Sequence, residues 1–215
     1  MTPLTGQNII VTAGPTIEAI DPVRFLSNRS SGKQGYLIAE ALAKSGADIR
    51  LVSGPTCLPC PDQVTRIEVE SARDMLAAVE HELPADIFIA VAAVADWRPA
   101  ETLTQKAGKA TRSHTLELVE NPDILKTVSF HTARPPLVIG FAAETHDLVE
   151  RARAKRQRKG CDWLVANDVS GDVMGGDENA VTLLTPAGEE NWPRASKREI
   201  AQRLAQSIAD HFSKL

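Results

Sequence analysis

Short apolar segments alternate with amphipathic segments from one end of the chain almost to the other. Between several of the apolar segments, apolar residues recur every three or four positions, as on one face of a helix. This alternation predicts strand–helix–strand units with right-handed crossovers. We therefore expect one α/β domain over residues 1–215, with a doubly wound, Rossmann-like, mostly parallel sheet and helices on both faces. The strand-like runs lie at residues 7–13, 48–53, 64–69, 86–95, 136–143 and 162–166.

Local signals mark where helices begin. The patterns at residues 71–74 and 196–199 are capping boxes, each a serine followed three positions later by an acid. Asn121 and Pro122 are typical of N-cap and first helical positions, and predict a helix to about residue 132. Residues 180–194 predict a β-hairpin before the last helix.

Residues 86–95 (DIFIAVAAVA) are almost continuously apolar. Such a run is typical of a central parallel strand covered on both faces. The polar, basic stretch at residues 98–114 follows it directly and predicts a long functional loop.

Ligands of open parallel sheets bind at the carboxyl ends of the strands. Acids follow several predicted strands and could hold Mg²⁺ or a sugar hydroxyl, although each could equally cap a helix. The residues after the strands are Gly14-Pro15-Thr16, Gly54-Pro55, Asp96-Trp97, Glu144-Thr145 and Asn167-Asp168.

Two stretches could bind anions. Ser30–Lys33 precedes Gly35 at a predicted helix start, where backbone amides suit a phosphate or carboxylate; a glycine-softened turn is the alternative. The helix over residues 151–159 carries six basic residues in nine, with Arg151, Lys155 and Lys159 on one stripe. This stripe is either a solvated face or a neutralising surface for a ligand's phosphates.

Composition excludes several classes of protein. The chain is 43% hydrophobic and has a net charge of −4, so we expect a globular protein that binds no nucleic acid. No apolar run is long enough to span a bilayer, and no secretion signal opens the sequence. Three cysteines form no disulfide framework, and Cys57 and Cys60 have no further zinc ligands at a useful spacing. We expect a cytoplasmic protein.

Several stretches together resemble the phosphopantothenate–cysteine ligase family, in its bacterial CTP-using branch. They occur in the family's order across almost the whole chain. The stretches are Thr12–Asn28, Ser30–Gly35, Ala92–Trp97, Asn121–Ile124, Gly140–Thr145, Lys155–Lys159 and Val165–Val169.

The resemblance implies a ligase of coenzyme A biosynthesis. It would join 4′-phosphopantothenate and L-cysteine through an acyl-cytidylate, with CTP as co-substrate and Mg²⁺ as cofactor, and would release CMP and pyrophosphate. The family also implies a homodimer, and fusion to or association with a flavin-dependent phosphopantothenoylcysteine decarboxylase. The residues alone leave CTP and ATP both open.

The family's functional residues fall into three groups here. Catalysis is expected from the amide side chain of Asn28, the backbone N–H groups of Ala92 and Ala93 as oxyanion donors, and Lys106 on a mobile loop. Nucleotide binding is expected from Ala90, Val91, Ala92, Asp96, Lys106, Pro122, Asp123, Ile124, Leu125, Phe141, Lys155 and Lys159. Substrate binding is expected from Arg24 of the partner subunit, with Asn28, Ser30, Ser31 and Gly32.

Two other functions share this fold class. A nicotinamide-dependent oxidoreductase would need a glycine-rich first turn and, in the short-chain type, a Tyr-x-x-x-Lys pair. Tyr36 is the only tyrosine, and Glu40 stands at the position of the lysine. A non-catalytic nucleotide- or RNA-binding module using the basic stripe would bind polyanions in a salt-dependent way without turnover.

Overall fold

A mixed sheet of eight strands organises the part of the chain that the computed structural model describes, residues 3–106, 115–144, 148–168 and 176–213. Across the sheet the strands are β12 (Gly188–Ser196), β11 (Glu178–Thr185), β10 (Trp163–Asp168), β9 (Leu137–Glu144), β6 (Ile87–Ala90), β1 (Asn8–Ala13), β4 (Asp48–Ser53) and β5 (Val64–Glu68). The helices are α1 (Lys33–Lys44), α2 (Ala72–His81), α3 (Ile124–Ser129), α4 (Leu148–Lys159) and α5 (Lys197–Phe212).

The six strands from β10 to β5 run parallel, whereas β11 and β12 form an antiparallel hairpin at the edge. The doubly wound α/β fold with a C-terminal hairpin and helix is therefore confirmed. No helix in the described ranges is long and apolar enough to cross a membrane.

Both faces of the sheet are covered, which explains why its central strands are apolar throughout. Ile9 and Val11 of β1 pack in a core with α1 and α5, represented by Leu42 and Leu204. Ile10, between them, belongs to a second core with α2, α3 and α4. Successive side chains of a strand point to opposite faces, so a strand buried on both sides alternates between two cores.

The capping predictions for α2 and α5 are confirmed. Ser71 accepts a hydrogen bond from the Asp74 amide, and Ser196 accepts one from the Glu199 amide. In both helices the carboxylate of the acid accepts hydrogen bonds from the serine hydroxyl and the serine amide. These bonds lower the pKa of both carboxyls, with the hydroxyl as the larger cause for Asp74 and the amide for Glu199.

Two predicted boundaries are wrong. The central strand β6 ends at Ala90 instead of Ala95, because the next amides bind the Thr12 hydroxyl and leave the ladder. The helix after Pro122 is α3, which begins at Ile124 with Asp123 as its N-cap and ends at Ser129. Asp123 is the N-cap in place of Asn121 because its carboxylate accepts a hydrogen bond from the Lys126 amide in the first turn of the helix.

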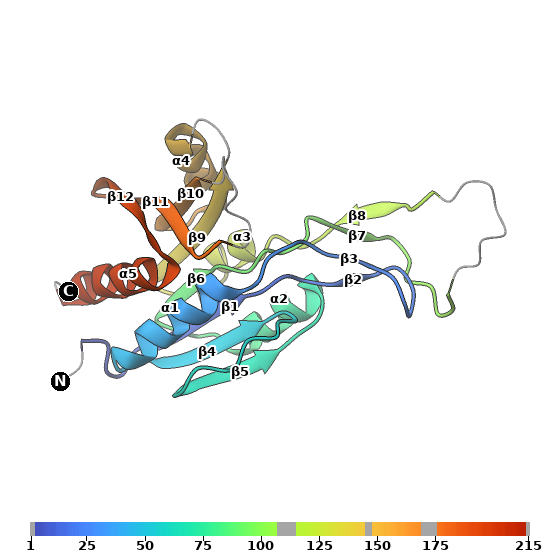
Figure 1. Cartoon of the computed structure of the whole chain (residues 1–215), viewed down its shortest axis with the longest axis horizontal. Coiled ribbons are helices and arrows are strands. Elements are labelled where there is room, and N and C mark those ends of the chain that lie inside the picture. The colour runs from blue at the N-terminus through green and yellow to red at the C-terminus, as the bar shows by residue number, and fades with distance from the viewer. Residues whose placement is uncertain (1–2, 107–114, 145–147, 169–175, 214–215) are drawn as a thin grey trace.

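Four short strands form an arm that the sequence pattern did not predict. They pair as β2 (Glu18–Ala19) with β3 (Phe25–Leu26) and as β7 (Trp97–Pro99) with β8 (Leu118–Glu120). Figure 1 shows both pairs reaching away from the sheet, next to each other. The predicted loop at residues 98–114 thus begins within β7, and its residues 107–114 lie outside the described ranges.

The close approach of α1 to β1 depends on Gly35. A Cβ at this position would lie 2.6 Å from the Ala13 Cβ and 3.2 Å from the Thr12 carbonyl oxygen. Both neighbours belong to β1, which is buried on both faces, so neither can move without disturbing the core.

We predict that Gly35→Ala lowers the free energy of unfolding by about 1–3 kcal/mol, the usual cost of overpacking. Helix propensity alone would give the opposite sign, since alanine is favoured over glycine in helices. Urea unfolding of this variant beside Lys44→Ala, an exposed change in the same helix, measures the effect. An unchanged or raised free energy of unfolding for Gly35→Ala would contradict the tight contact.

Candidate functional site

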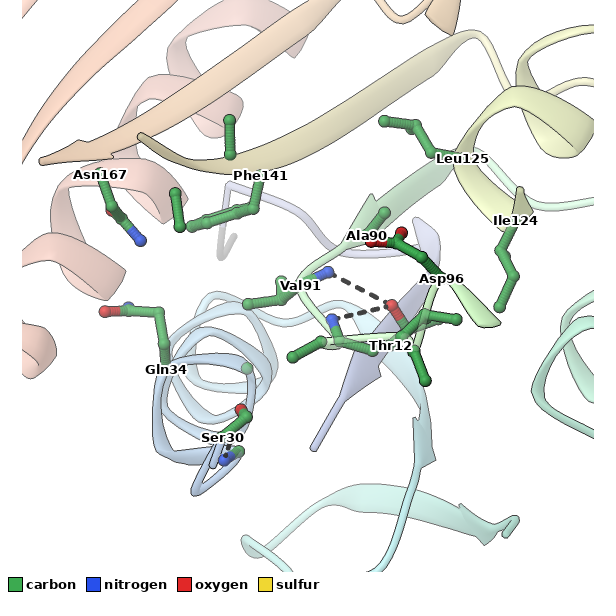
Figure 2. A pocket seen from close by; sticks show the side chains of 18 of the residues that line it. Thr12, Ser30, Gln34, Ala90, Val91, Asp96, Ile124, Leu125, Phe141 and Asn167 are labelled. Atoms are coloured by element: carbon green, nitrogen blue, oxygen red, sulfur yellow. Dashed lines mark hydrogen bonds between the residues drawn. The ribbon is translucent and has the colours of Figure 1, made fainter. Parts of the chain in front are cut away.

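A cavity of about 730 Å³ opens where the strand order reverses, at the carboxyl ends of β1 and β6. Chain order runs outward from β1 to β4 and β5 on one side, and from β6 to β9 on the other, so the loops diverge at this point. Such a divergence is the usual binding crevice of an open parallel sheet. Figure 2 shows Thr12, Ala90 and Val91 at its centre.

The cavity gathers all but three of the residues to which the family resemblance assigns catalysis or binding. The lining includes Ser30, Ser31, Gly32, Ala90, Val91, Ala92, Ala93, Asp96, Pro122, Asp123, Ile124, Leu125, Phe141, Lys155 and Lys159. The residues outside the lining are Arg24, Asn28 and Lys106. Lys106 is exposed at the end of a described range.

Two threonines from β1 and the turn after it hold the segment that follows β6. The Thr12 hydroxyl accepts the amides of Val91 and Ala92, at 3.2 and 3.3 Å. The Thr16 hydroxyl, fully buried, accepts the amide of Ala95 at 3.0 Å. These bonds bend residues 91–95 across the mouth of the sheet, where they form the floor of the cavity.

The expected oxyanion donors, Ala92 and Ala93, already donate within the protein. The Ala93 amide binds the carbonyl oxygen of Gly14 at 2.9 Å, and the Ala92 amide binds Thr12. Both residues line the cavity, but in this arrangement neither N–H is free for a ligand. The structure thus places both residues in the cavity lining, with both amides engaged inside the protein instead of free to act as donors.

Asn28 is hydrogen-bonded both to the segment after β6 and to the next loop. Its Nδ2 donates to the Ala93 carbonyl oxygen, and its Oδ1 accepts the Ser30 amide at 3.0 Å. One side chain thus fixes the segment after β6 relative to the Ser30–Gly32 loop.

One end of the cavity is formed by α3 and α4. Asp123 caps α3 and forms an ion pair with Lys159, which reaches it from α4. Lys155 lines the same end, whereas Arg151 is absent from the lining. Two of the three residues of the basic stripe therefore line a cavity of small-molecule size, and the stripe is not simply a solvated helix face.

The opposite end contains Asn167, which the sequence analysis named among the residues that follow strands, and further residues that it did not assign to a site. Figure 2 shows Gln34 and Asn167 on the side away from Ile124. Lys197, at the first position of α5, and Asn179 complete this end. The capping box does place Lys197 at a helix start, but only the packing of α5 on α1 brings it to the cavity.

Lysines give this cavity a positive character. Besides Lys155 and Lys159, the lining includes Lys33 and Lys197. Lys197 is 8% exposed, and burial, reinforced by the charge of Lys33, lowers its pKa. Such a site attracts anions electrostatically.

The described residues include no cluster of three or more histidines, cysteines or acids that could hold a metal ion. Asp96 alone among the predicted ligands presents a carboxylate to the cavity, apart from Asp123 with its ion pair. Of the other acids expected after strands, the side chains of Glu144 and Asp168 lie outside the described part.

None of the three cysteines lines the cavity. Cys57 and Cys60 are exposed, and Cys161 is buried beneath β9, where burial raises the pKa of its thiol to about 11. A thiol with that pKa is almost entirely protonated near neutral pH and is a poor nucleophile.

Arg24 lies on the arm, in the turn between β2 and β3. It forms a two-point ion pair with Asp21, at 2.9 Å through Nε and 2.6 Å through Nη2. Figure 1 shows this hairpin extending away from the sheet, which separates Arg24 from the cavity of its own chain.

Comparison with known proteins gives a consistent result. The family model described as the DNA/pantothenate metabolism flavoprotein C-terminal domain matches residues 4–212. A coenzyme A biosynthesis bifunctional protein of Vibrio vulnificus is 47% identical over 211 residues, which is 96% of this chain and 53% of that protein. The chain thus spans about half the length of the curated relatives it matches.

Solved structures agree. The crystal structure of the C-terminal domain of a coenzyme A biosynthesis bifunctional protein superposes with a TM-score of 0.85 at 40% identity, covering 100% of both chains. A Cab2 variant in complex with phosphopantothenate-cysteine has a TM-score of 0.77, covering 97% of this chain and 88% of that one. Its 14% identity supports the fold alone.

We predict that Thr12→Val lowers the free energy of unfolding by about 1–3 kcal/mol, because the amides of Val91 and Ala92 lose their acceptor. Valine has nearly the shape of threonine, so the change removes the hydroxyl without opening a cavity. Thr12→Ser is the matched control, since it keeps the oxygen. Urea unfolding should rank valine below serine; equal stability of the valine variant and the wild type would contradict the clamp.

Proposed function

The chain belongs to the family of DNA/pantothenate metabolism flavoprotein C-terminal domains, and from this membership we propose that it joins 4′-phosphopantothenate to L-cysteine at the expense of CTP. The observation that carries the proposal is the lysine-lined cavity at the β1–β6 divergence, which gathers the family's motifs. Its volume of about 730 Å³ suits a nucleotide together with a second substrate.

The reaction has two steps. A carboxylate oxygen of 4′-phosphopantothenate bonds to the α-phosphorus of CTP while the bond to pyrophosphate breaks. The amine nitrogen of cysteine then bonds to the acyl carbon and loses a proton, and CMP leaves with the electron pair of the broken carbon–oxygen bond. Both steps concentrate negative charge, which fixed cations in a cavity stabilise.

The nucleotide is assigned to the α3–α4 end. Pro122–Leu125 would cradle the nucleoside, with Phe141 against the base and ribose. Lys155 and Lys159 reach the same end from α4. Ala90 and Val91 would form the floor beneath the sugar and first phosphate.

Asn28 is assigned to orient the acyl phosphate. Its Nδ2 has two hydrogens, and one of them serves the Ala93 carbonyl oxygen. The second hydrogen has no acceptor among the described residues and could donate to a developing oxyanion. Because the Ala92 and Ala93 amides are engaged, this role falls to the Asn28 side chain. Ser30, Ser31 and Gly32 would contact phosphopantothenate beside it.

Mg²⁺ fits this cavity without a preformed metal cage. The ion is commonly bound through one or two carboxylates together with substrate phosphates and water. Asp96 would supply the carboxylate. Bound there, Mg²⁺ would neutralise phosphate charge, and Lys106 would add a further positive charge from the loop that begins at the arm.

A homodimer would complete the site. Large apolar side chains are exposed along the arm: Val23, Phe25, Trp97, Leu103, Leu116 and Leu118, between 41% and 61%. Such a concentration of exposed apolar surface is typical of an interface. Arg24 lies among these residues, so the arm of one subunit would bring Arg24 to the phosphopantothenate of its partner.

A flavin-dependent phosphopantothenoylcysteine decarboxylase would act on the product. The curated relatives are about twice as long as this chain and are named bifunctional. We therefore place this ligase beside such a decarboxylase, fused or separate, in the cytoplasm.

The central test is a pyrophosphate-release assay in which one component is omitted at a time. We predict that release requires both CTP and phosphopantothenate, and that without cysteine it stops after about one turnover because the acyl-cytidylate accumulates. CMP release should require cysteine as well. Pyrophosphate release that is independent of phosphopantothenate would contradict the proposal, and a parallel series with ATP determines the nucleotide preference.

We predict that Phe25→Ser converts the dimer to a monomer, because it places a hydroxyl in the apolar interface. Turnover should fall at least tenfold, since each site loses the partner's Arg24. Phe130→Ser is the matched control, because Phe130 is 67% exposed but lies on the end of α3. Light scattering measures the mass; a fully active wild-type monomer, or a Phe25→Ser dimer, would contradict the shared site.

A further inference from the structure

The end of the cavity formed by α1 and α5 contains a largely buried lysine, Lys197, that forms no ion pair within the described residues. Lys197 is 8% exposed, and its ammonium group has no hydrogen-bond or ion-pair partner among the described residues. The nearest carboxylate that acts on it, Asp177, is exposed and forms an ion pair with Lys33. A largely buried lysine with no ion-pair partner among the described residues is a candidate for binding an anion in the cavity that it lines.

The polar groups around Lys197 are incompletely paired as well. Gln34 Oε1, Asn167 Oδ1 and Asn179 Oδ1 are buried and have no partner in the described part of the chain. All three residues line the same cavity, and Figure 2 shows Gln34 and Asn167 on one side of it. Buried polar groups in folded proteins normally have partners, so these exceptions mark a polar end of the cavity. All three unpaired atoms are amide oxygens that accept hydrogen bonds, so the negative charge of a ligand would be met by Lys197 and not by them.

The packing of α5 on α1 keeps this end rigid. The Gln34 Nε2 donates to the Lys197 carbonyl oxygen at 3.1 Å, which ties the start of one helix to the start of the other. The Lys197 amide in turn donates to the Asp177 carbonyl oxygen at 2.8 Å. The Lys197 backbone is therefore fixed before any ligand arrives.

The two ends of the cavity differ in how their lysines are used. At the α3–α4 end, Lys159 is already neutralised by Asp123, whereas Lys197 at the other end is not. An elongated ligand with a neutral portion and a polyanionic tail would place its tail at Lys197. CTP has that shape, with a nucleoside at one end and the β- and γ-phosphates at the other.

We propose that Lys197, together with Gln34, Asn167 and Asn179, forms the subsite for the β- and γ-phosphates of the nucleotide and for the pyrophosphate that leaves. The inference rests on the proposed function, in which CTP occupies the cavity. Lys197 contributes a positive charge, and the NH2 groups of the three side-chain amides are the parts that can donate to phosphate oxygens. A phosphate contact of this kind is charge-assisted and correspondingly strong. Their unpaired carbonyl oxygens are acceptors, so they would bind water or a hydroxyl group and not the phosphate itself.

The test is calorimetric binding of inorganic pyrophosphate, CTP and CMP to the full chain, without turnover. Lys197→Met keeps the length and removes the charge, and Lys44→Met is the control, a lysine 67% exposed in its side chain on α1. We expect the dissociation constants of pyrophosphate and CTP to rise about tenfold or more in Lys197→Met. CMP, which lacks the outer phosphates, should bind within about twofold of the wild type, and the control should bind all three normally.

Stability separates a ligand-binding role from a structural one. Removal of an unpaired buried charge should leave the melting temperature of the unliganded protein unchanged or raise it. Lys197→Gln, which keeps a polar end, provides a second variant if the methionine variant fails to fold. Unchanged pyrophosphate binding in a folded variant would overturn the proposal, as would equal weakening of CMP or a raised KM for cysteine alone.

The outcome also distinguishes this inference from the ligase proposal. If pyrophosphate and CTP bind in a Lys197-dependent way but no product forms, the subsite stands and the ligase assignment fails. If the wild type makes product and Lys197→Met binds pyrophosphate normally, the ligase assignment stands and the subsite fails.

Discussion

The hydrogen bonds from the β1 region to the segment after β6 are the constraint on which the site depends. Thr12 and Thr16 accept three amides of residues 91–95, and Gly14 accepts a fourth. These acceptors lie on the other side of the point where the strand order reverses. Because they pair with the amides of residues 91–95, the chain can leave the sheet after Ala90 without burying unpaired N–H groups. That departure creates the cavity floor, and it also takes the Ala92 and Ala93 amides away from the ligand.

Charge is distributed unevenly around this floor. Lys159 has its partner in Asp123, and Lys33 has one in Asp177, but the largely buried Lys197 forms no ion pair within the described part of the chain. Burial of a charged lysine lowers the stability of the unliganded protein, and an anion bound beside Lys197 would offset that cost. The burial of Lys197 costs folding free energy, which is easier to explain if the residue binds a ligand than if it serves the fold alone.

The arm presents the opposite case, in which apolar groups are exposed. Four short strands place Phe25, Trp97 and Leu118 in solvent, far from either core. Two-stranded ribbons of this length have little stability of their own. A second copy of the chain would cover these side chains, and it would bring Arg24 toward a cavity that its own chain does not let it reach.

The sequence by itself determined the features that depend on neighbours along the chain. The capping boxes at Ser71 and Ser196, the apolar central strands and the terminal hairpin follow from local hydrogen bonding and from a two-residue or 3.6-residue period. The ordered motifs also identified most of the cavity lining. The end of β6, the arm and the position of Lys197 were decided only by the tertiary structure. Each depends on a partner far away in sequence: Thr12 for Val91, β8 for β7, and Gln34 for Lys197. Residue type and spacing carry no record of such contacts, because their geometry exists only once the sheet and its helices have packed.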